Sequence, residues 1–322
     1  MYEPHKRAYR HPKYKTSYRV KNWPEYEKSL RDRGDITIWL SEEAIDAWTP
    51  PKNGKRGGQP VYSDIAIETT LSLRLLFHLP LRQAEGFLRS MFRLLEVDLP
   101  FPDHTTLSRR NRTVDVHRRI ESLPDGPVSF IVDSTGLKVC GQGEWHAEKH
   151  RGKRRKRWKK LHIGVNETGC ILASKVTEGH EQDPSLLPDL LDEVDREIDR
   201  FVGDGIYDQE PVYEAVAHHS PGATVIVPPR KDAVISDGSV NALLQRDRHI
   251  AEIETIGRSN CRRRSGYYLQ SHAENAFYRY KTIIGGRLRA KRDEAQEREA
   301  AIACALLNRM HDMGRPVSYP VR

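Results

Sequence analysis

The sequence predicts an α/β fold, in which a mixed sheet carries helices on both faces and follows an all-helical region. Between residues 61 and 120, apolar residues recur at helical spacing, as in "SDIAIETTLSLRLLF". After the boundary "SLPDGP" at 122–127, the β-branched runs "VSFIVDSTGLKV" and "KLHIGVNETGCILASKVTEG" are typical of strands. From residue 183 onward, helical segments and short strands alternate, which favours a sheet covered on both faces.

The composition restricts the partners and the compartment that we expect. The chain of 322 residues carries 53 Lys and Arg against 45 Asp and Glu, a formal net charge of +8. This balance favours a polyanionic partner. No apolar stretch approaches the ~20 residues that span a bilayer, so no membrane partner is expected. The first residues lack the apolar core of a signal peptide and the four cysteines form no CxxC pair, which predicts a cytoplasmic protein.

Two regions are predicted before the sheet. Residues 1–60 are polar and are expected to form a flexible basic N-terminal segment, ending in the linker "PPKNGKRGGQP". Residues 61–124 are expected to form a helical region with three helices, the last over 102–120. That last helix is rich in arginine, including Arg109 and Arg110, and suits the recognition helix of a helix-turn-helix DNA-binding region. An ordinary helical bundle with a solvated basic face is the alternative.

The sheet is expected to occupy residues 125–314, with an insertion around 231–266 and a tail at 315–322. Within it, "DPSLLPDLLDEVDREIDR" is predicted as one helix with Asp183 at the cap and Pro184 in the first turn. Capping explains Asp183 and a turn explains Asp208, although both acids could also approach a metal site.

Two aspartates follow apolar strand residues directly. Asp133 ends "FIVD", and Asp204 ends "RFVGD". Groups at strand ends of an open α/β sheet face a crevice where ligands bind. A carboxylate is costly to bury there unless a cation neutralises it, and Mg²⁺ prefers oxygen ligands of this kind. Each aspartate alone has a simpler interpretation as a turn or cap residue.

A third carboxylate is expected on a helix that crosses the same edge of the sheet, within "YYLQSHAENAFYRYKTIIGGRL" at 267–288. Tyr267, Glu274 and Lys281 are spaced by seven and would line one face of that helix. A glutamate between a phenol and an ammonium group suits a metal site that also holds a phosphate backbone. A solvated Glu–Lys surface is the alternative.

Six blocks of the sequence resemble, in the same order, those of DDE-type insertion-sequence transposases, closest to the insertion-sequence-five family. They are "VDSTGLKV", "GEWH…KH", "RRKRWKKLH", "DGIYD", "IVPPRK" and "ENAFYRYK…GGRL…R". The resemblance runs from Gly57 to the C-terminus. It implies an RNase H-like catalytic fold in which Asp133, Asp204 and Glu274 are catalytic and hold two divalent ions, Mg²⁺ or Mn²⁺.

The resemblance also implies the partners and the reaction. The protein would bind the terminal inverted repeats of its insertion sequence, cut the transposon ends and join the freed 3′-hydroxyl to target DNA. It would assemble as a homo-oligomer on double-stranded DNA and associate with the bacterial nucleoid. A nuclease that cuts without joining, and a DNA-binding regulator with an inactive catalytic fold, are the alternatives.

Related transposases carry the signature Y-x2-R-x3-E-x6-K around the glutamate. Tyr267, Glu274 and Lys281 match it, and Tyr267 and Lys281 would hold the DNA strand near the cut. The arginine position is occupied by Gln270, so Arg279 or Arg263 would have to supply the phosphate contact.

A basic run lies between the expected strand that carries Asp133 and the next expected strand. Nine of the twelve residues from 149 to 160 are Lys or Arg. We expect this run to bind DNA phosphates and its flanking tryptophans to stack on unpaired bases. The expected contacts are Trp145, Lys149, Arg154, Arg155, Arg157, Trp158 and Lys159. A solubilising hairpin, with either tryptophan in the core, is the alternative. The histidines at 146, 150, 162 and 180 match no usual zinc spacing.

Overall fold

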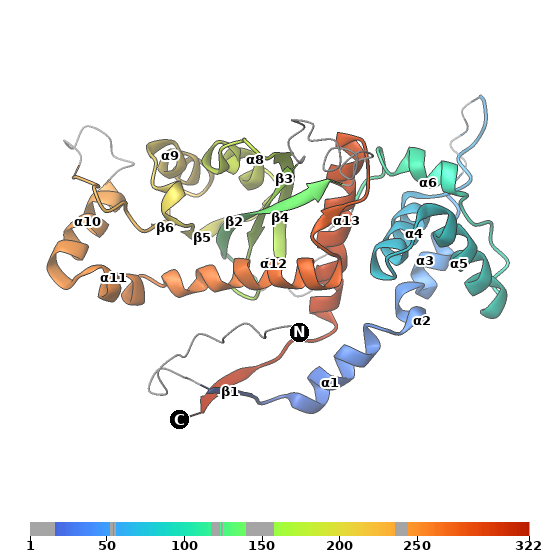
Figure 1. The fold of residues 1–322 in the computed structure, drawn as a ribbon, viewed down its shortest axis with the longest axis horizontal. Helices are drawn as coiled ribbons and strands as arrows, with labels where there is room; N and C mark the ends of the chain where they lie inside the picture. Colours follow the sequence, from blue (N-terminus) through green and yellow to red (C-terminus); the bar gives the residue numbers. More distant parts are fainter. Residues whose placement is uncertain are drawn as a thin grey trace, which may run out of the picture.

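The computed structural model of the protein describes residues 17–51, 54, 56–116, 123, 125–139, 158–235 and 244–321. In these residues a mixed sheet with helices on both faces lies beside a group of N-terminal helices (Figure 1). Helix α13 (Asp293–Asp312) lies between the two parts and packs on both β4 and α4 (Figure 1).

The central sheet has the strand order β4-β3-β2-β5-β6. Its strands are β2 (Val128–Val139), β3 (Trp158–Val165), β4 (Ile171–Glu178), β5 (Ile198–Val202) and β6 (Thr224–Ile226). The first three in sequence pair antiparallel, whereas β5 runs parallel to β2 and β6 runs parallel to β5. A short strand, β7 (Arg287–Leu288), pairs with the end of β2. The mixed α/β sheet predicted from the sequence is therefore confirmed.

Both faces of the sheet are buried. Successive side chains of a strand point to opposite faces, so neighbouring residues of β2 enter two different cores. Phe130 and Val132 of β2 pack into a core with α8 (Leu187–Leu191) and α9 (Glu210–His219). Ile131 and Leu137 pack into a second core with α12 (Ser271–Ile283) and α13. By the same alternation Asp133 belongs to the α12 face of β2, and Ser134 belongs to the α8 face.

The N-terminal part is more ordered than the sequence predicts. Residues 17–51 contain strand β1 (Ser17–Val20) and helices α1 (Trp23–Asp32), α2 (Ile36–Trp39) and α3 (Glu42–Asp46). Trp48 is fully buried, its indole N–H donates to the Pro100 carbonyl at 2.7 Å, and its ring packs on Phe92. The prediction of a flexible segment over 1–60 needs correction here, because these aromatic side chains anchor the segment to helices further along the chain.

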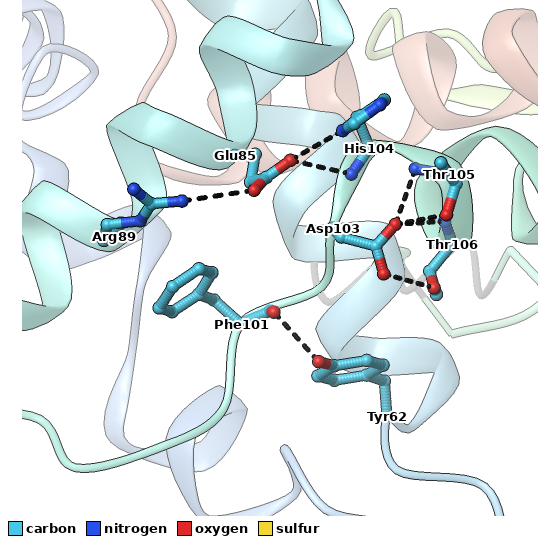
Figure 2. A network of polar contacts seen from close by, with 8 residues as sticks. All are labelled: Tyr62, Glu85, Arg89, Phe101, Asp103, His104, Thr105 and Thr106. Carbon is cyan, nitrogen blue, oxygen red and sulfur yellow. Dashed lines mark hydrogen bonds and ion pairs between the residues drawn. The ribbon is translucent and has the colours of Figure 1, made fainter.

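Three further helices follow: α4 (Asp64–Leu76), α5 (Leu81–Leu94) and α6 (His104–Arg110). Helix α6 begins where Asp103 accepts hydrogen bonds from the backbone N–H groups of Thr105 and Thr106 (Figure 2). Next to this cap, Glu85 of α5 accepts from both the backbone N–H and the ring of His104, at 3.0 and 2.8 Å (Figure 2). The helix is shorter than the predicted 102–120, since residues 111–116 are turn and irregular backbone.

The N-terminal helices share an apolar core with the α12 face of the sheet. A buried ion pair crosses this junction, where a guanidinium nitrogen of Arg74 in α4 lies 3.9 Å from the Glu299 carboxylate in α13. The same carboxylate accepts backbone hydrogen bonds from Arg289 and Ala290, each at 2.8 Å. The helical region therefore packs directly against the sheet domain.

The ends of the described chain pair with each other, since β1 runs antiparallel to β8 (Ser318–Val321). The predicted insertion contains α10 (Leu244–Ile256) and α11 (Arg258–Arg264), which lie between β6 and α12 in sequence (Figure 1). No helix in the described ranges is both long enough and apolar enough to cross a membrane.

Candidate active site

Strand pairing brings Asp133 and Asp204 to neighbouring positions in the sheet. Ile131 of β2 and Val202 of β5 are register partners on parallel strands. Asp133 follows Ile131 by two residues, and Asp204 follows Val202 by two residues. Because β5 ends at Val202, Asp204 lies in the loop after β5, beside the middle of β2. This is the edge at which parallel strands present their carboxyl ends to a crevice.

The local structure fixes Asp204 without using both of its oxygens. Asp204 caps the short helix η3 (Gly205–Tyr207), and its Oδ1 accepts from the backbone N–H of Ile206 at 2.9 Å. Its Oδ2 accepts no hydrogen bond from the described part of the chain. One carboxylate oxygen is therefore open to a ligand.

Glu274 reaches the same region from α12, which packs across β2 and β3. The side chain of Gln270, at the start of that helix, donates to the Val132 carbonyl at 3.0 Å. This bond ties the start of α12 to the strand residue just before Asp133. Glu274 itself is exposed, one turn further along the helix. The three predicted acids thus come from a central strand, a strand end and a helix anchored to that strand.

Asp133 lies within the electrostatic influence of the other acids. The pKa of Asp133 is raised to about 6, first by burial and then by repulsion from the carboxylates of Asp204, Glu274 and Asp183. The backbone N–H of Ser134, at 2.8 Å, lowers it and only partly offsets these effects. Among described residues, no Lys, Arg or His forms an ion pair with Asp133, Asp204 or Glu274. The described residues therefore provide no ion-pair partner for the negative charge of this site.

The donor set fits a hard divalent cation, because all three groups are carboxylates and none forms an ion pair within the described ranges. As placed, no three His, Cys, Asp or Glu side chains of the described ranges are close enough to hold one ion. The arrangement still has the chemistry of a metal site, since carboxylate oxygens are the ligands that hard divalent ions prefer.

Tyr267 lies beside these acids, although the helix predicted over 267–288 begins later. It belongs to the 3₁₀ turn η5 (Tyr267–Gln270), which precedes α12. Burial raises its pKa, and Asp204, Asp133 and Glu274 add to this effect. The guanidinium carbon of Arg262 lies 5.3 Å from the centre of the Tyr267 ring.

Lys281 lies in the last turn of α12 and is exposed, seven residues beyond Glu274. This spacing places the two side chains near the same face of the helix. The predicted Tyr–Glu–Lys grouping is therefore compatible with the observed helix, even though its tyrosine precedes the α-helical part.

Two predicted DNA contacts need correction, because their charges are used inside the protein. Lys159 is only 5% exposed and pairs with Glu178 and Asp293, at 2.6 and 3.1 Å. Arg279 donates to the Leu307 carbonyl at 2.6 Å, so its guanidinium faces α13. Arg279 is therefore not placed to replace the signature arginine.

The other predicted contacts divide into three groups. Arg110 donates to Asp64 at 2.6 Å and to the Tyr62 carbonyl, whereas Arg109 is exposed and donates to Thr106 of its own helix. Trp158 is 42% exposed, with the Lys138 ammonium 5.6 Å from its ring centre. The remaining residues of the basic run lie outside the described residues: Trp145, Lys149, Arg154, Arg155 and Arg157.

Two acids that the sequence assigned to local roles have tertiary partners, although Asp208 does follow the 3₁₀ turn η3 as predicted. Asp183 lies inside a 3₁₀ helix rather than at a cap, and its carboxylate bonds to Lys160 and Ser134. Asp208 is buried and pairs with Arg246 at 2.8 Å. Neither role has a local sequence signal, because the partners come from other strands and helices.

Comparison with known families agrees with this geometry. Two family models, each described as "Transposase DDE domain", match residues 31–142 and 124–309. The second covers more than half of the chain and includes β2, the end of β5 and α12. The predicted relation to the insertion-sequence-five family in particular stays a prediction. The chain therefore belongs to the transposase DDE domain family and is a transposase, an enzyme that cleaves and transfers DNA strands.

Proposed function

We propose that Asp133, Asp204 and Glu274 bind the divalent ions, two Mg²⁺ or Mn²⁺, with which this transposase cuts and transfers DNA strands. The observation that supports this most is the raised pKa of Asp133, to about 6, beside two other acids that form no ion pair with any described residue. Such a site loses free energy in the metal-free state and recovers it when a cation binds. Asp204 follows the carboxyl end of β5, beside Asp133 on β2, and α/β folds bind ligands at such strand ends.

The bound ions would lower the pKa of the attacking water or 3′-hydroxyl and stabilise the leaving oxygen. Asp133 lies on a strand buried on both faces, so its position is rigid. Asp204 keeps one oxygen free of hydrogen bonds within the described chain. Glu274 is exposed on a helix, so its longer side chain can close the ligand shell from the solvent side.

The DNA strand would be held by the positive groups next to these acids, namely Lys281 and Arg262, together with Tyr267. Arg262 is exposed and makes no ion pair with any described residue. Its helix α11 is docked to the loop after β6, because Arg258 donates to the carbonyls of Pro229 and Arg230. A fixed cation beside an acidic site suits a phosphate contact that neutralises the approaching strand.

We further propose that the protein binds the terminal inverted repeats of its insertion sequence and assembles as a homo-oligomer on double-stranded DNA. The basic run from 149 to 160, with Trp145 and Trp158, and the helical region with Arg109 would add contacts outside the active site. The net charge of +8 supports this expectation, as does the exposure of Trp158 and Arg109. An association with the nucleoid follows from such DNA binding.

The experiment that tests this function uses Asp133→Asn and a duplex carrying one end of the element. The variant should bind the duplex as the wild type does and lose Mg²⁺-dependent cleavage. The control Asp189→Asn removes an acid that pairs with Lys175 on the surface, and it should cleave normally. Cleavage by Asp133→Asn at the wild-type rate would reject Asp133 as a metal ligand.

A further inference from the structure

A fourth acid, Asp183, lies behind the candidate metal site and is held from two sides. It is only 8% exposed and begins the 3₁₀ helix η2 (Asp183–Leu186). The Lys160 ammonium donates to its Oδ1 at 2.8 Å, and the Ser134 hydroxyl donates to its Oδ2 at 2.6 Å. Lys160 also donates to the Glu181 carbonyl at 2.9 Å, so the ammonium clamps the start of the helix.

Strand geometry places this network on the opposite side of β2 from the metal ligands. Ser134 follows Asp133, and adjacent strand residues point to opposite faces. Ser134 is the register partner of His162, and Gly136 is the register partner of Lys160. Lys160 and His162 therefore lie on the same face as Ser134, under the backbone that carries Asp133.

Burial decides whether His162 or Lys160 is the positive group that faces Asp183. Burial lowers the pKa of His162 to about 4, so the imidazole is neutral at pH 7. Its Nδ1 lies 3.9 Å from Asp183 and has no hydrogen-bond partner in the described chain, while its Nε2 contacts Thr177 at 2.9 Å. Lys160 thus carries the cation that faces Asp183, and it orders this carboxylate.

A carboxylate at this position has an energetic cost, because Asp183 is one of the acids that repel Asp133. Helix capping does not explain it, since the cap residue of η2 is Gln182. Its strongest contact with β2 is the 2.6 Å bond to the residue next to Asp133. Residues that do not touch the metal but orient one of its ligands typically contribute ~10–100-fold to metal affinity.

We propose that Asp183 is a positioning residue, which is held by Lys160 and fixes Ser134 so that Asp133 stays oriented toward the divalent ion. This inference rests on the proposed role of Asp133 as a metal ligand. The ligand that it concerns is a divalent cation, and no contact between Asp183 and that cation is required.

The test measures Mn²⁺ binding to the full chain without DNA, by electron paramagnetic resonance. Ser134→Ala removes the bond to Asp183 and keeps the ion pair with Lys160, so it should fold normally and bind Mn²⁺ about tenfold more weakly. Asp183→Ala should weaken Mn²⁺ binding by a similar factor. The double variant should bind Mn²⁺ no more weakly than the single variant with the lower affinity, because both changes break the same contact. Asp189→Ala, which removes an acid of a surface pair on α8, should leave the Kd unchanged.

Each outcome separates this inference from the proposed function. If Ser134→Ala binds Mn²⁺ with the wild-type Kd while Asp133→Asn loses binding, the role of Asp183 is rejected and the metal site stands. If Asp133→Asn also binds Mn²⁺ like the wild type, both are rejected. Should Asp183→Ala fail to fold, Ser134→Ala alone decides, because it leaves both charges in place.

Discussion

Replacing Asp133 by asparagine should stabilise the metal-free protein at neutral pH while it abolishes catalysis. The carboxylate is largely buried among three other acids, so its charged form is costly in the folded state. Asparagine has nearly the same shape, can still accept the Ser134 N–H, and carries no charge. The substitution therefore removes repulsion without opening a cavity.

The magnitude follows from the pKa. A rise from the ordinary 3.8 to about 6 corresponds to about 3 kcal/mol, at ~1.36 kcal/mol for each tenfold change in proton affinity. Screening by solvent at this partly exposed group reduces the expected effect to about 2 kcal/mol. Between about pH 4 and pH 6 the folded state keeps a proton that the unfolded state has lost, so wild-type stability falls as the pH rises. Above about pH 6 the full penalty is present.

The assay is denaturant unfolding of both proteins in EDTA, at pH 7.5 and at pH 4. The variant should be more stable by about 2 kcal/mol at pH 7.5, and the difference should disappear toward pH 4. Excess Mn²⁺ should stabilise the wild type and leave the variant unchanged. Asp98→Asn, at an exposed position before α6, serves as the control. A variant that is no more stable than the wild type at pH 7.5, or a difference independent of pH, would refute the reasoning.

Two other substitutions test the DNA contact and the sheet. Arg262→Ala should reduce the slope of log Kobs against log salt by ~0.9 for a duplex of arbitrary sequence, because one phosphate contact is lost. Arg196→Ala changes a residue just before β5, at the end of the strand away from Asp204, and should leave the salt slope at the wild-type value. Equal salt slopes for the two variants would exclude Arg262 from the DNA interface. Gly164→Ala should destabilise the fold by at least ~2 kcal/mol in urea unfolding, because the added Cβ would lie 2.0 Å from the Phe130 ring. Gly222→Ala meets no atom within 4 Å and should cost much less, so similar losses would contradict the packing.

Local patterns in the sequence were sufficient for the parts of the fold that depend on periodicity. Strand β5 ends before Asp204 as predicted, and Glu274 lies on a helix as its spacing by seven from Lys281 suggested. The mixed sheet was predicted from the same local patterns. The prediction that Asp133 ends a strand was wrong, because β2 continues to Val139. The neighbouring positions of Asp133 and Asp204 then follow from strand pairing, because β2 and β5 run parallel with Ile131 and Val202 in register.

The features that were missed depend on contacts between distant residues. Asp183 looks like a cap in the sequence, but its ammonium partner is 23 residues away on β3. Lys159 belongs to a basic run, yet it is buried by acids on β4 and α13. Trp48 lies in a polar region and finds its partner 52 residues later, at Pro100. Composition describes the average of a segment and cannot assign such individual partners.

The shorter α6 has a similar explanation. Residues 102–120 were predicted as one helix, and the observed helix begins near the predicted start, after its N-cap Asp103. The backbone leaves the helix after Arg110, whose side chain bonds to Asp64 and to the Tyr62 carbonyl. Tertiary contacts therefore decide where the helix ends and which of its arginines remain exposed.

The central proposal is that Asp133, Asp204 and Glu274 bind the same divalent ions during strand cleavage. The most direct test is an anomalous diffraction map of the protein bound to a cut DNA end and Mn²⁺. The account predicts metal peaks about 2.1 Å from carboxylate oxygens of all three residues. Mn²⁺ bound at the cut phosphate without one of these three carboxylates would contradict it.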